Sequence, residues 1–308
     1  MKNKIKIKDY FGINISPTLC RDTDLWLKKL REIGVGWVRL EFDWYNPKFE
    51  KFDLFILGLE KAKIQILGST IGFVPGNLKY LLYPPKKYSP FNDLPVYLEF
   101  LEKCCKRYPN IRYWEIYNEP NLKRFWINKP DPKEYLVMLR KGSKIIRKYG
   151  GKVVCGGIAF NDEMHMPFVR RHFLKDLIRL GADDYVDFFN IHPYSLTCYM
   201  SFAKKESFMK QIRREIDSVI SRFGKDVWIT EWGISDLWNF GVSSEDIGLI
   251  YLYALKYAAS KGIKLFIWNF NDFIIKGNFP PEGSFGLIDA NNKEKDSFRI
   301  LANALKND

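Results

Sequence analysis

The chain has 308 residues, 46% of them hydrophobic and 16% aromatic, which is enough for one large α/β barrel or for two ordinary domains. Lysine and arginine total 49 against 36 aspartate and glutamate residues, giving a formal net charge of +13. The basic residues are scattered and accompany no zinc-finger, bZIP or RNP-like motif, so nucleic-acid binding is not expected as the main function. No run of 18 apolar residues is present, and no membrane-spanning helix is expected.

The cysteines and the first residues bear on the cellular compartment. Five cysteines without CxxC spacing predict free thiols rather than disulfides or a zinc site, and the adjacent Cys104 and Cys105 are expected to be buried. Residues 1–8 alternate lysine with isoleucine and lack the apolar segment of a secretory signal. We therefore expect a cytoplasmic protein. Abundant lysine and glutamate with only two glutamines is typical of a thermophile-like surface.

Strand and helix patterns alternate along the whole chain. Eight apolar, β-rich runs are expected as strands: Phe11–Ile15, Trp37–Glu41, Ile64–Gly68, Tyr113–Glu119, Lys152–Gly157, Asp187–His192, Val227–Glu231 and Leu265–Asn269. Helical spacing predicts helices over residues 24–33, 52–63, 95–108, 131–149, 168–180, 207–223, 244–260 and 297–305. Asp24 is expected to cap the first helix. A long loop rich in Pro, Gly and Tyr is expected from Gly72 to Pro95.

Eight βα units without internal repeats predict an α/β fold, a single (β/α)8 TIM barrel in one domain over residues 1–308. A doubly wound sheet is the alternative fold, but the glycine-rich phosphate turn that usually marks it is missing from the sequence.

Two of the expected strands end in a glutamate. The run Tyr113–Glu119 is stopped by Pro120, and a second run ends at Glu231. In TIM barrels the carboxyl ends of the strands form the active site. Hydrolysis of a glycosidic bond with retention requires two carboxyl groups roughly 5–5.5 Å apart. The pair therefore predicts a retaining glycoside hydrolase, with Glu119 as acid/base and Glu231 as nucleophile.

Polar residues at other strand ends fit this interpretation. Arg39 is expected to hydrogen-bond Glu231 and to lower its pKa through the opposite charge. Asn118 is placed to bond the 2-hydroxyl of a sugar. Taken singly, Arg39 is also explained as a structural ion-pair partner, and Asn118 as a cap of the turn that follows it.

His192, Tyr194 and Trp268 complete the predicted set. Tyr194 is expected to bond Glu231, and His192 to orient a carboxylate or a sugar hydroxyl. Trp268 would form the floor beneath the sugar at the cleavage site. A lone histidine on a strand is more often a core residue, and a tryptophan is often packing, so the inference depends on all these side chains meeting at one face.

Other chemistries have little support in the sequence. His165 and His172 have no carboxylate or cysteine at metal-ligand spacing, and no Gly-x-Ser-x-Gly motif is present. We therefore expect no metal and no cofactor.

The motifs as a set resemble a known group of enzymes. Asn118–Pro120 and Ile229–Gly233 look like the two catalytic strand ends of clan A glycoside hydrolases, and Trp114–Trp126 is similar to glycoside hydrolase family 39 or its cellulase-like relatives. Phe285–Asp289 resembles the closing segment of that clan. The resemblance implies a (β/α)8 retaining enzyme with the acid/base after strand four and the nucleophile after strand seven.

One departure from the family narrows the expectation. Family 39 xylosidases typically carry a β-sandwich domain beyond the barrel, and this sequence has none, which favours cleavage of β-linked oligo- or polysaccharides over exo-xylosidase activity. The motifs do not distinguish glucanases, mannanases, galactosidases and glucuronidases from one another, so the identity of the sugar stays open. The many lysines raise acidic sugars as an option. A transglycosylase, or a barrel that binds carbohydrate without cleaving it, are the alternatives. The expected partner is a carbohydrate substrate, without nucleic acid or membrane, and the oligomeric state is open.

Overall fold

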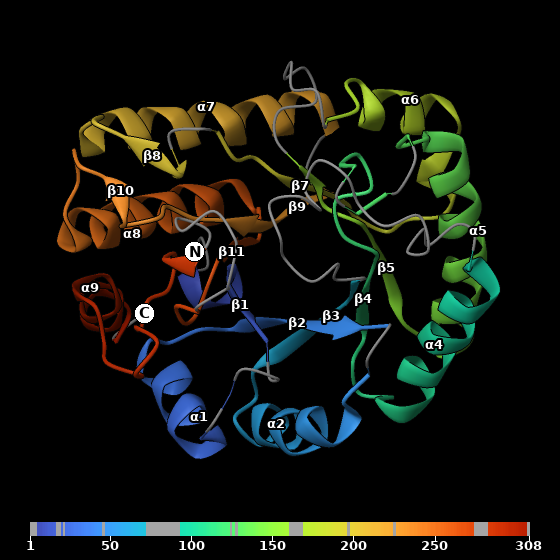
Figure 1. Ribbon diagram of the computed structural model, residues 1–308, viewed down its shortest axis with the longest axis horizontal. Helices are drawn as coiled ribbons and strands as arrows, with labels where there is room; N and C mark the ends of the chain where they lie inside the picture. Colours follow the sequence, from blue (N-terminus) through green and yellow to red (C-terminus); the bar gives the residue numbers. More distant parts are fainter. Residues whose placement is uncertain are drawn as a thin grey trace.

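In a computed structural model, parallel strands form a ring that helices surround (Figure 1). The structure describes residues 5–16, 20, 22–44, 47–71, 93–123, 125–126, 129–159, 169–195, 198–223, 226–273 and 283–306. The ring strands are β1 (Phe11–Ile15), β2 (Trp37–Asp43), β3 (Gln65–Ile71), β4 (Tyr113–Ile116), β5 (Lys152–Cys155), β6 (Ile158–Ala159), β7 (Phe189–His192), β9 (Val227–Trp232) and β11 (Leu265–Ile267).

The strand order confirms the predicted TIM barrel. Nine strands pair in parallel in the order β5-β4-β3-β2-β1-β11-β9-β7-β6. A parallel bridge between Val154 and Phe188 joins β5 to the residue before β7, and the Cys155 amide donates to the Phe188 carbonyl at 2.9 Å. These contacts close the ring, so that eight strands form the barrel and the short β6 extends its rim beside β7.

Helices cover the outside of the barrel (Figure 1). They are α1 (Thr23–Glu32), α2 (Phe49–Lys61), α4 (Leu94–Arg107), α5 (Pro132–Lys148), α6 (Phe173–Arg179), α7 (Lys205–Phe223), α8 (Ser244–Lys261) and α9 (Asp296–Leu305). A two-stranded parallel pair, β8 (Met200–Ser201) with β10 (Trp238–Asn239), lies in the segments that follow β7 and β9.

Most predicted boundaries lie within a few residues of the observed ones. The helix expected from residue 168 begins at Phe173 instead, after His172 in a left-handed conformation, and two other differences have identifiable reasons. The cap of α1 is Asp22 rather than Asp24, because the Asp22 carboxylate accepts the Leu25 amide at 2.9 Å. The fourth strand ends at Ile116 rather than Glu119, since the chain turns through a left-handed conformation at Tyr117. Of the predicted loop from Gly72 to Pro95, residues 72–92 lie outside the described part.

Aromatic side chains fill the amino-terminal end of the barrel. Trp37 packs edge-on against Trp228 with ring centroids 5.3 Å apart, and the Phe266 ring lies over Gly12. A Cβ on Gly12 would lie 2.1 Å from that ring, so this position requires glycine. Leu67 is buried in the same cluster. We call this cluster, which includes Trp37, Leu67, Trp228 and Phe266, the aromatic plug. Because the plug fills the amino-terminal end of the barrel, polar side chains in the barrel interior must lie at the carboxyl end.

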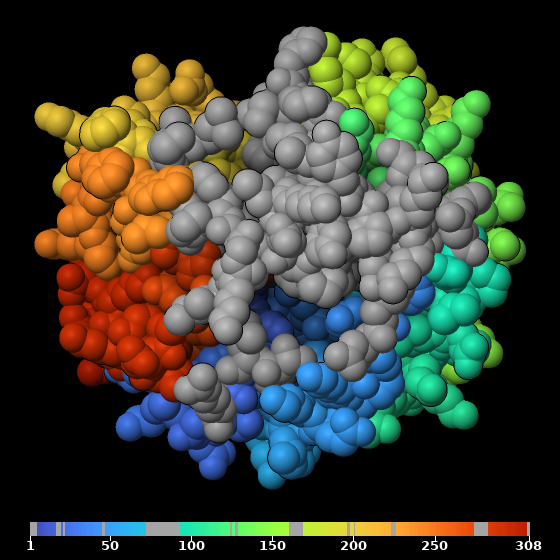
Figure 2. Space-filling model, viewed as in Figure 1, coloured from blue at the N-terminus to red at the C-terminus, as the bar shows by residue number. Residues whose placement is uncertain are grey.

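The two ends of the described chain are joined to each other. Trp26 on α1 donates from its indole nitrogen to Asn292 at 2.9 Å, and Lys29 pairs with Glu294. Figure 2 shows the result, with the blue amino-terminal sector lying directly beside the red carboxyl-terminal sector on the rim.

The five cysteines are free thiols, and Cys104 and Cys105 are buried, as predicted. Within the described ranges, no helix is long and apolar enough to cross a bilayer.

Candidate active site

Above the aromatic plug, a fully buried arginine organises the interior. Arg39 on β2 donates from Nε and Nη2 to the two carboxylate oxygens of Glu115 on β4, at 2.6 and 3.1 Å. Its Nη1 also donates to Asn14 at 2.8 Å and its Nη2 to Ser69 at 3.0 Å. Burial acts to lower the pKa of Arg39, but the adjacent Glu115 carboxylate outweighs it and holds that pKa above its ordinary value. Arg39 is therefore cationic and bound chiefly to Glu115.

The same guanidinium reaches upward to two residues of the predicted site. Its Nη2 donates to the Asn118 side-chain oxygen at 2.7 Å, and its Nη1 lies 3.4 Å from Glu231 Oε2. The Glu231 contact is thus the longer one, and Arg39 is shared among several acceptors. Burial raises the pKa of Glu231 to about 7, and the neighbouring Glu119 adds to that rise. Arg39 does act to lower this pKa, as expected, but burial has the larger effect, so the pKa of Glu231 is raised overall.

An irregularity in β9 aims Glu231 into the barrel. Ile229 of β9 is in register with Leu265 of β11, and Trp232 is in register with Ile267. The chain advances three residues on β9 but two on β11, so β9 carries one extra residue over this stretch. In a regular strand Thr230 and Glu231 would face opposite sides. Here the Thr230 hydroxyl accepts from the Asn190 amide inside the barrel at 2.6 Å, while Glu231 contacts Arg39. A bulge beside an active site commonly re-aims a side chain in this way.

Glu119 is placed by a constrained turn after β4. Tyr117 and Glu119 have φ angles of 69° and 43°, a left-handed conformation that is uncommon for residues other than glycine. The turn is fixed by hydrogen bonds from the Tyr117 amide to Thr70 Oγ1 at 3.2 Å and from the Leu122 amide to the Glu119 carbonyl at 2.9 Å. Such strain at a polar strand end is typical of a functional site.

His192 on β7 bridges the two glutamates. Its Nδ1 lies 3.0 Å from Glu119 Oε1 and 3.6 Å from Glu231 Oε2, and its Nε2 lies 3.0 Å from the Thr230 hydroxyl. Burial lowers the pKa of His192 to about 4, so the imidazole is neutral at neutral pH. In the tautomer in which Nε2 accepts from Thr230, the Nδ1 proton is directed at Glu119. The ring lies against Gly157, where a Cβ would come within 2.0 Å of Nε2.

Glu119, His192 and Glu231 form a compact buried group. One polar atom from each lies within 4.8 Å of the other two. This is the set within the described part of the chain that is suited to hold a metal ion. Spacing along the chain gave no sign of it, because the three side chains come from three different strand ends.

Tyr194 follows β7 and Trp268 follows β11, the two strands that flank β9. The Tyr194 hydroxyl donates to Glu231 Oε1 at 3.3 Å, and the side chain is buried. Trp268 directly follows β11, is half-buried, and packs edge-on against Phe273 with ring centroids 6.4 Å apart. Six of the seven predicted residues are therefore joined by direct contacts, while the ring contact of Trp268 is with Phe273.

Several polar residues of the barrel interior were missed by the sequence analysis. The sequence signal that could have identified them is the alternation of side chains along a strand. It puts Glu41 on the same face of β2 as Arg39, and Asn190 on the same face of β7 as His192. The missed interior residues are Asn14, Glu41, Ser69, Glu115, Asn190 and Thr230.

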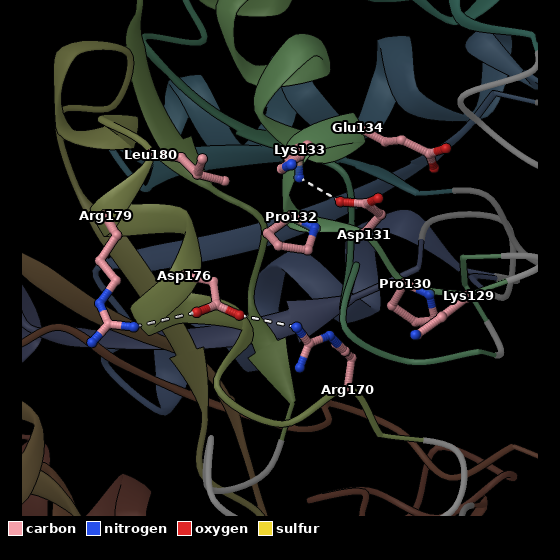
Figure 3. Close-up of a pocket in the computed structure, with 10 residues that line it drawn as sticks. All are labelled: Lys129, Pro130, Asp131, Pro132, Lys133, Glu134, Arg170, Asp176, Arg179 and Leu180. Atoms are coloured by element: carbon pink, nitrogen blue, oxygen red, sulfur yellow. Dashed lines mark hydrogen bonds and ion pairs between the residues drawn. The ribbon is translucent and has the colours of Figure 1, made fainter.

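A separate surface pocket of about 650 Å³ lies between the start of α5 and α6 (Figure 3). Asp176 sits between Arg170 and Arg179 there, at 3.0 and 3.8 Å, and Asp131 caps α5 by accepting the Lys133 amide at 2.7 Å. Its two aspartates thus bond to arginines and to a helix end, and its lining includes no member of the strand-end set.

The fold and the paired carboxyl groups at its strand ends define a class of protein, the TIM-barrel glycoside hydrolases. The family described as "Glycosyl hydrolase catalytic core" matches residues 98–271, more than half of the chain, and this chain belongs to that family. It is therefore a glycosyl hydrolase catalytic core.

Solved structures of similar fold include enzymes of three glycoside hydrolase families. A family 39 glycoside hydrolase from Bacteroides cellulosilyticus WH2 is 18% identical with a TM-score of 0.65, over 99% of this chain and 66% of that one. A family 5 lichenase from Caldicellulosiruptor sp. F32, a variant in complex with cellotetraose, is 16% identical with a TM-score of 0.64, over 97% of this chain and 93% of that one. A β-glucosidase from Exiguobacterium marinum is 14% identical with a TM-score of 0.65, over 99% of both chains.

These similarities confirm the predicted resemblance to TIM-barrel glycoside hydrolases. At such identities they show the fold, and this chain spans slightly less than two thirds of the family 39 enzyme.

Proposed function

We propose that the protein is a retaining β-glycosidase that works by double displacement. The observation that carries the proposal is the spacing of the two glutamates, since an oxygen of Glu119 and an oxygen of Glu231 lie within 4.8 Å of each other. Retaining enzymes hold their carboxyl groups roughly 5–5.5 Å apart, whereas inverting enzymes need about 6.5–9.5 Å to admit a water molecule. The close approach of this oxygen pair favours the retaining arrangement over the inverting one.

The partners of each glutamate support the assignment of roles. Glu231 receives one donor on each oxygen, from Tyr194 and from Arg39, which favours its ionised form as nucleophile. Glu119 faces the neutral imidazole of His192. A neutral partner allows Glu119 to hold a proton before the first step and to accept one in the second.

In the first step, Glu231 attacks the anomeric carbon and the bond to the leaving oxygen breaks. Glu119 gives its proton to that oxygen, and a covalent glycosyl-enzyme forms. In the second step, Glu119 takes a proton from water, which displaces Glu231 and releases the sugar with its original configuration.

Two further side chains bind the sugar in this scheme. Because Arg39 occupies the Asn118 side-chain oxygen, the amide nitrogen of Asn118 is the end that donates to the 2-hydroxyl. Trp268, at the end of β11, supports the face of the sugar ring.

The two carboxyl groups titrate as a coupled pair. A negative charge on Glu119 raises the pKa of Glu231, so the doubly ionised site is disfavoured and one proton is retained by the pair near neutral pH. Activity therefore requires the state in which Glu231 is ionised while Glu119 carries the proton.

The test is hydrolysis of a panel of aryl β-glycosides by wild type, Glu119→Ala and Glu231→Ala. Each variant is expected to lose several powers of ten in turnover, whereas Glu99→Ala, an exposed position on α4, serves as a matched control. The configuration of the first sugar released, followed by NMR, distinguishes retention from inversion. A product of inverted configuration, or unchanged turnover in either variant, would refute the assignment.

Added azide sharpens the assignment of roles. With Glu231→Ala, azide replaces the nucleophile and gives a glycosyl azide of inverted configuration. With Glu119→Ala, azide replaces the second-step water and gives a retained one. The opposite pattern would exchange the two roles, and products with an acceptor sugar in place of water would indicate a transglycosylase.

A further inference from the structure

A third carboxylate shares the mouth of the barrel with the catalytic pair. Glu41 lies two residues after Arg39 on β2, on the same face of the strand. It is in register with Ser69 on β3, which is in turn in register with Glu115 on β4. Ser69 and Glu115 both bond to Arg39 inside the barrel, so the whole row, Glu41 included, faces the interior.

The exposure of these side chains separates those that reach the cleft from those that lie beneath it. The Glu115 side chain is fully buried, whereas Glu119 and Glu231 each keep 11% exposure. The Glu41 side chain keeps 14%, so it reaches solvent at least as far as the catalytic pair. Arg39 Nη1 lies 3.2 Å from Glu41 Oε1 and 3.4 Å from Glu231 Oε2, so one guanidinium nitrogen lies between these two carboxylates.

The charge balance of this part of the barrel is negative. Three carboxyl groups contact a single guanidinium, whose closest contact is to the deepest of them, and a fourth contacts the imidazole, which is neutral at neutral pH. Burial raises the pKa of Glu41, and the adjacent Arg39 opposes that rise. With Glu41 ionised and one proton held by the catalytic pair, the cleft carries more negative than positive charge. Inside a protein the dielectric is low, so this field acts strongly on a bound sugar. The four carboxyl groups are Glu41, Glu115, Glu119 and Glu231.

We propose that Glu41 contacts the sugar bound at the cleavage site, accepts hydrogen bonds from its hydroxyl groups, and selects against sugars that carry a carboxylate. The inference rests on the proposed glycosidase function, since it places the sugar between Glu119 and Glu231. A hydroxyl or ammonium substituent is a donor and suits Glu41, whereas a uronic acid would bring a second anion against it. Neutral and amino sugars are therefore the substrate class, in contrast to the acidic sugars that the surface lysines suggested.

The experiment compares three aryl β-glycosides that share one leaving group and differ only at C6: a glucoside, a 6-amino-6-deoxyglucoside and a glucuronide. The galactose series provides the same comparison if the protein prefers the other configuration. The wild type is expected to show kcat/KM at least about tenfold higher for the neutral sugar than for its uronic acid. Glu41→Gln keeps the shape of the side chain and removes its charge. It should reduce this preference by about tenfold and lower the relative rate on the amino sugar.

Two readouts separate contact with substrate from a structural role. A merely structural effect of Glu41→Gln would scale all three substrates equally, whereas loss of a contacting charge moves the anionic and cationic sugars in opposite directions. Glu99→Gln, on the outer face of α4, changes the net charge equally and should leave the three ratios unaltered.

The pH profile gives an independent measure. The acidic limb of kcat/KM on the neutral sugar should move to lower pH by about half a unit in Glu41→Gln, because the Glu41 charge helps to raise the pKa of Glu231. The titratable and charged groups that face Glu231 are His192, Glu119, Arg39, Glu41 and Tyr194.

Each outcome decides the inference. A wild type that hydrolyses the uronic acid as fast as the neutral sugar, or a Glu41→Gln variant whose ratios match those of the control, would overturn it while leaving the glycosidase assignment standing. A wild type inactive on every glycoside would overturn the proposed function, and this inference with it.

Discussion

Two buried groups of the site affect stability in opposite directions as the pH changes. Burial raises the pKa of Glu231 from its ordinary value near 4.5 to about 7, and lowers that of His192 from 6.5 to about 4. Between about pH 4.5 and 6.5 the folded protein keeps a proton on Glu231 that the unfolded chain has released. It lacks the proton on His192 that the unfolded chain still carries. The first effect makes the free energy of unfolding fall as the pH rises, and the second makes it rise.

In the wild type these contributions largely cancel, so single substitutions expose them. Each displacement of about 2.5 pH units is worth ~3 kcal/mol at about 1.4 kcal/mol per unit. Relative to wild type, Glu231→Gln should gain ~3 kcal/mol of stability as the pH rises from about 4.5 to 7. His192→Gln should lose a similar amount between about pH 4 and 6.5.

The assay is the thermal midpoint of unfolding at half-unit steps from pH 4.5 to 7. For a chain of 308 residues, ~3 kcal/mol corresponds to about 5 °C. The Glu231→Gln midpoint should therefore rise by about 5 °C relative to wild type over this range, and the His192→Gln midpoint should fall. Glu99→Gln, which is exposed, should follow the wild type. A constant difference between Glu231→Gln and wild type at every pH would show that Glu231 has no raised pKa in the folded protein.

Three further substitutions test the supporting structure. Glu115→Ala leaves the buried Arg39 without its main partner and should cost about 3–5 kcal/mol in urea unfolding, with Glu115→Asp as the variant that keeps the charge. Gly12→Ala places a methyl group 2.1 Å from the Phe266 ring and should destabilise the barrel by about 1–3 kcal/mol in the same assay. Thr230→Val removes the hydroxyl beside the imidazole and should lower kcat/KM by about tenfold, with Thr230→Ser restoring it; equal losses in both would contradict this reasoning.

The barrel and its two glutamates could be predicted because their signals are local. Alternating β-rich and helical runs require only the chain itself, and Pro120 and Gly233 mark where two strands stop. The carboxyl ends of parallel strands must meet at one end of the barrel, so residues distant in sequence were correctly placed together. The long loop from Gly72, the single-domain organisation and the cytoplasmic location stay predictions.

The pairing within the site could not be predicted in the same way. Arg39 has three carboxylates within reach, and which one it binds most closely depends on the depth of each in the barrel. The inward aim of Glu231 depends on a single extra residue in β9, which leaves no mark in the alternation of side chains. The direction of its pKa shift depends on burial, which a sequence does not reveal for a residue at a strand end.

The net charge of +13 describes the outside of this molecule rather than its cleft. Exposed lysines such as Lys148 and Lys152 lie on the outer surface and at the start of β5, where solvent screens them. The field at a bound sugar is set instead by buried groups along the strands, where a single guanidinium faces several carboxylates. Counting charges over a whole chain therefore predicts little about the charge of its substrate. The alternation of side chains along a strand identifies its inward residues, which on β2 are Trp37, Arg39 and Glu41. Charges counted on these inward faces predict a cleft that binds neutral or amino sugars.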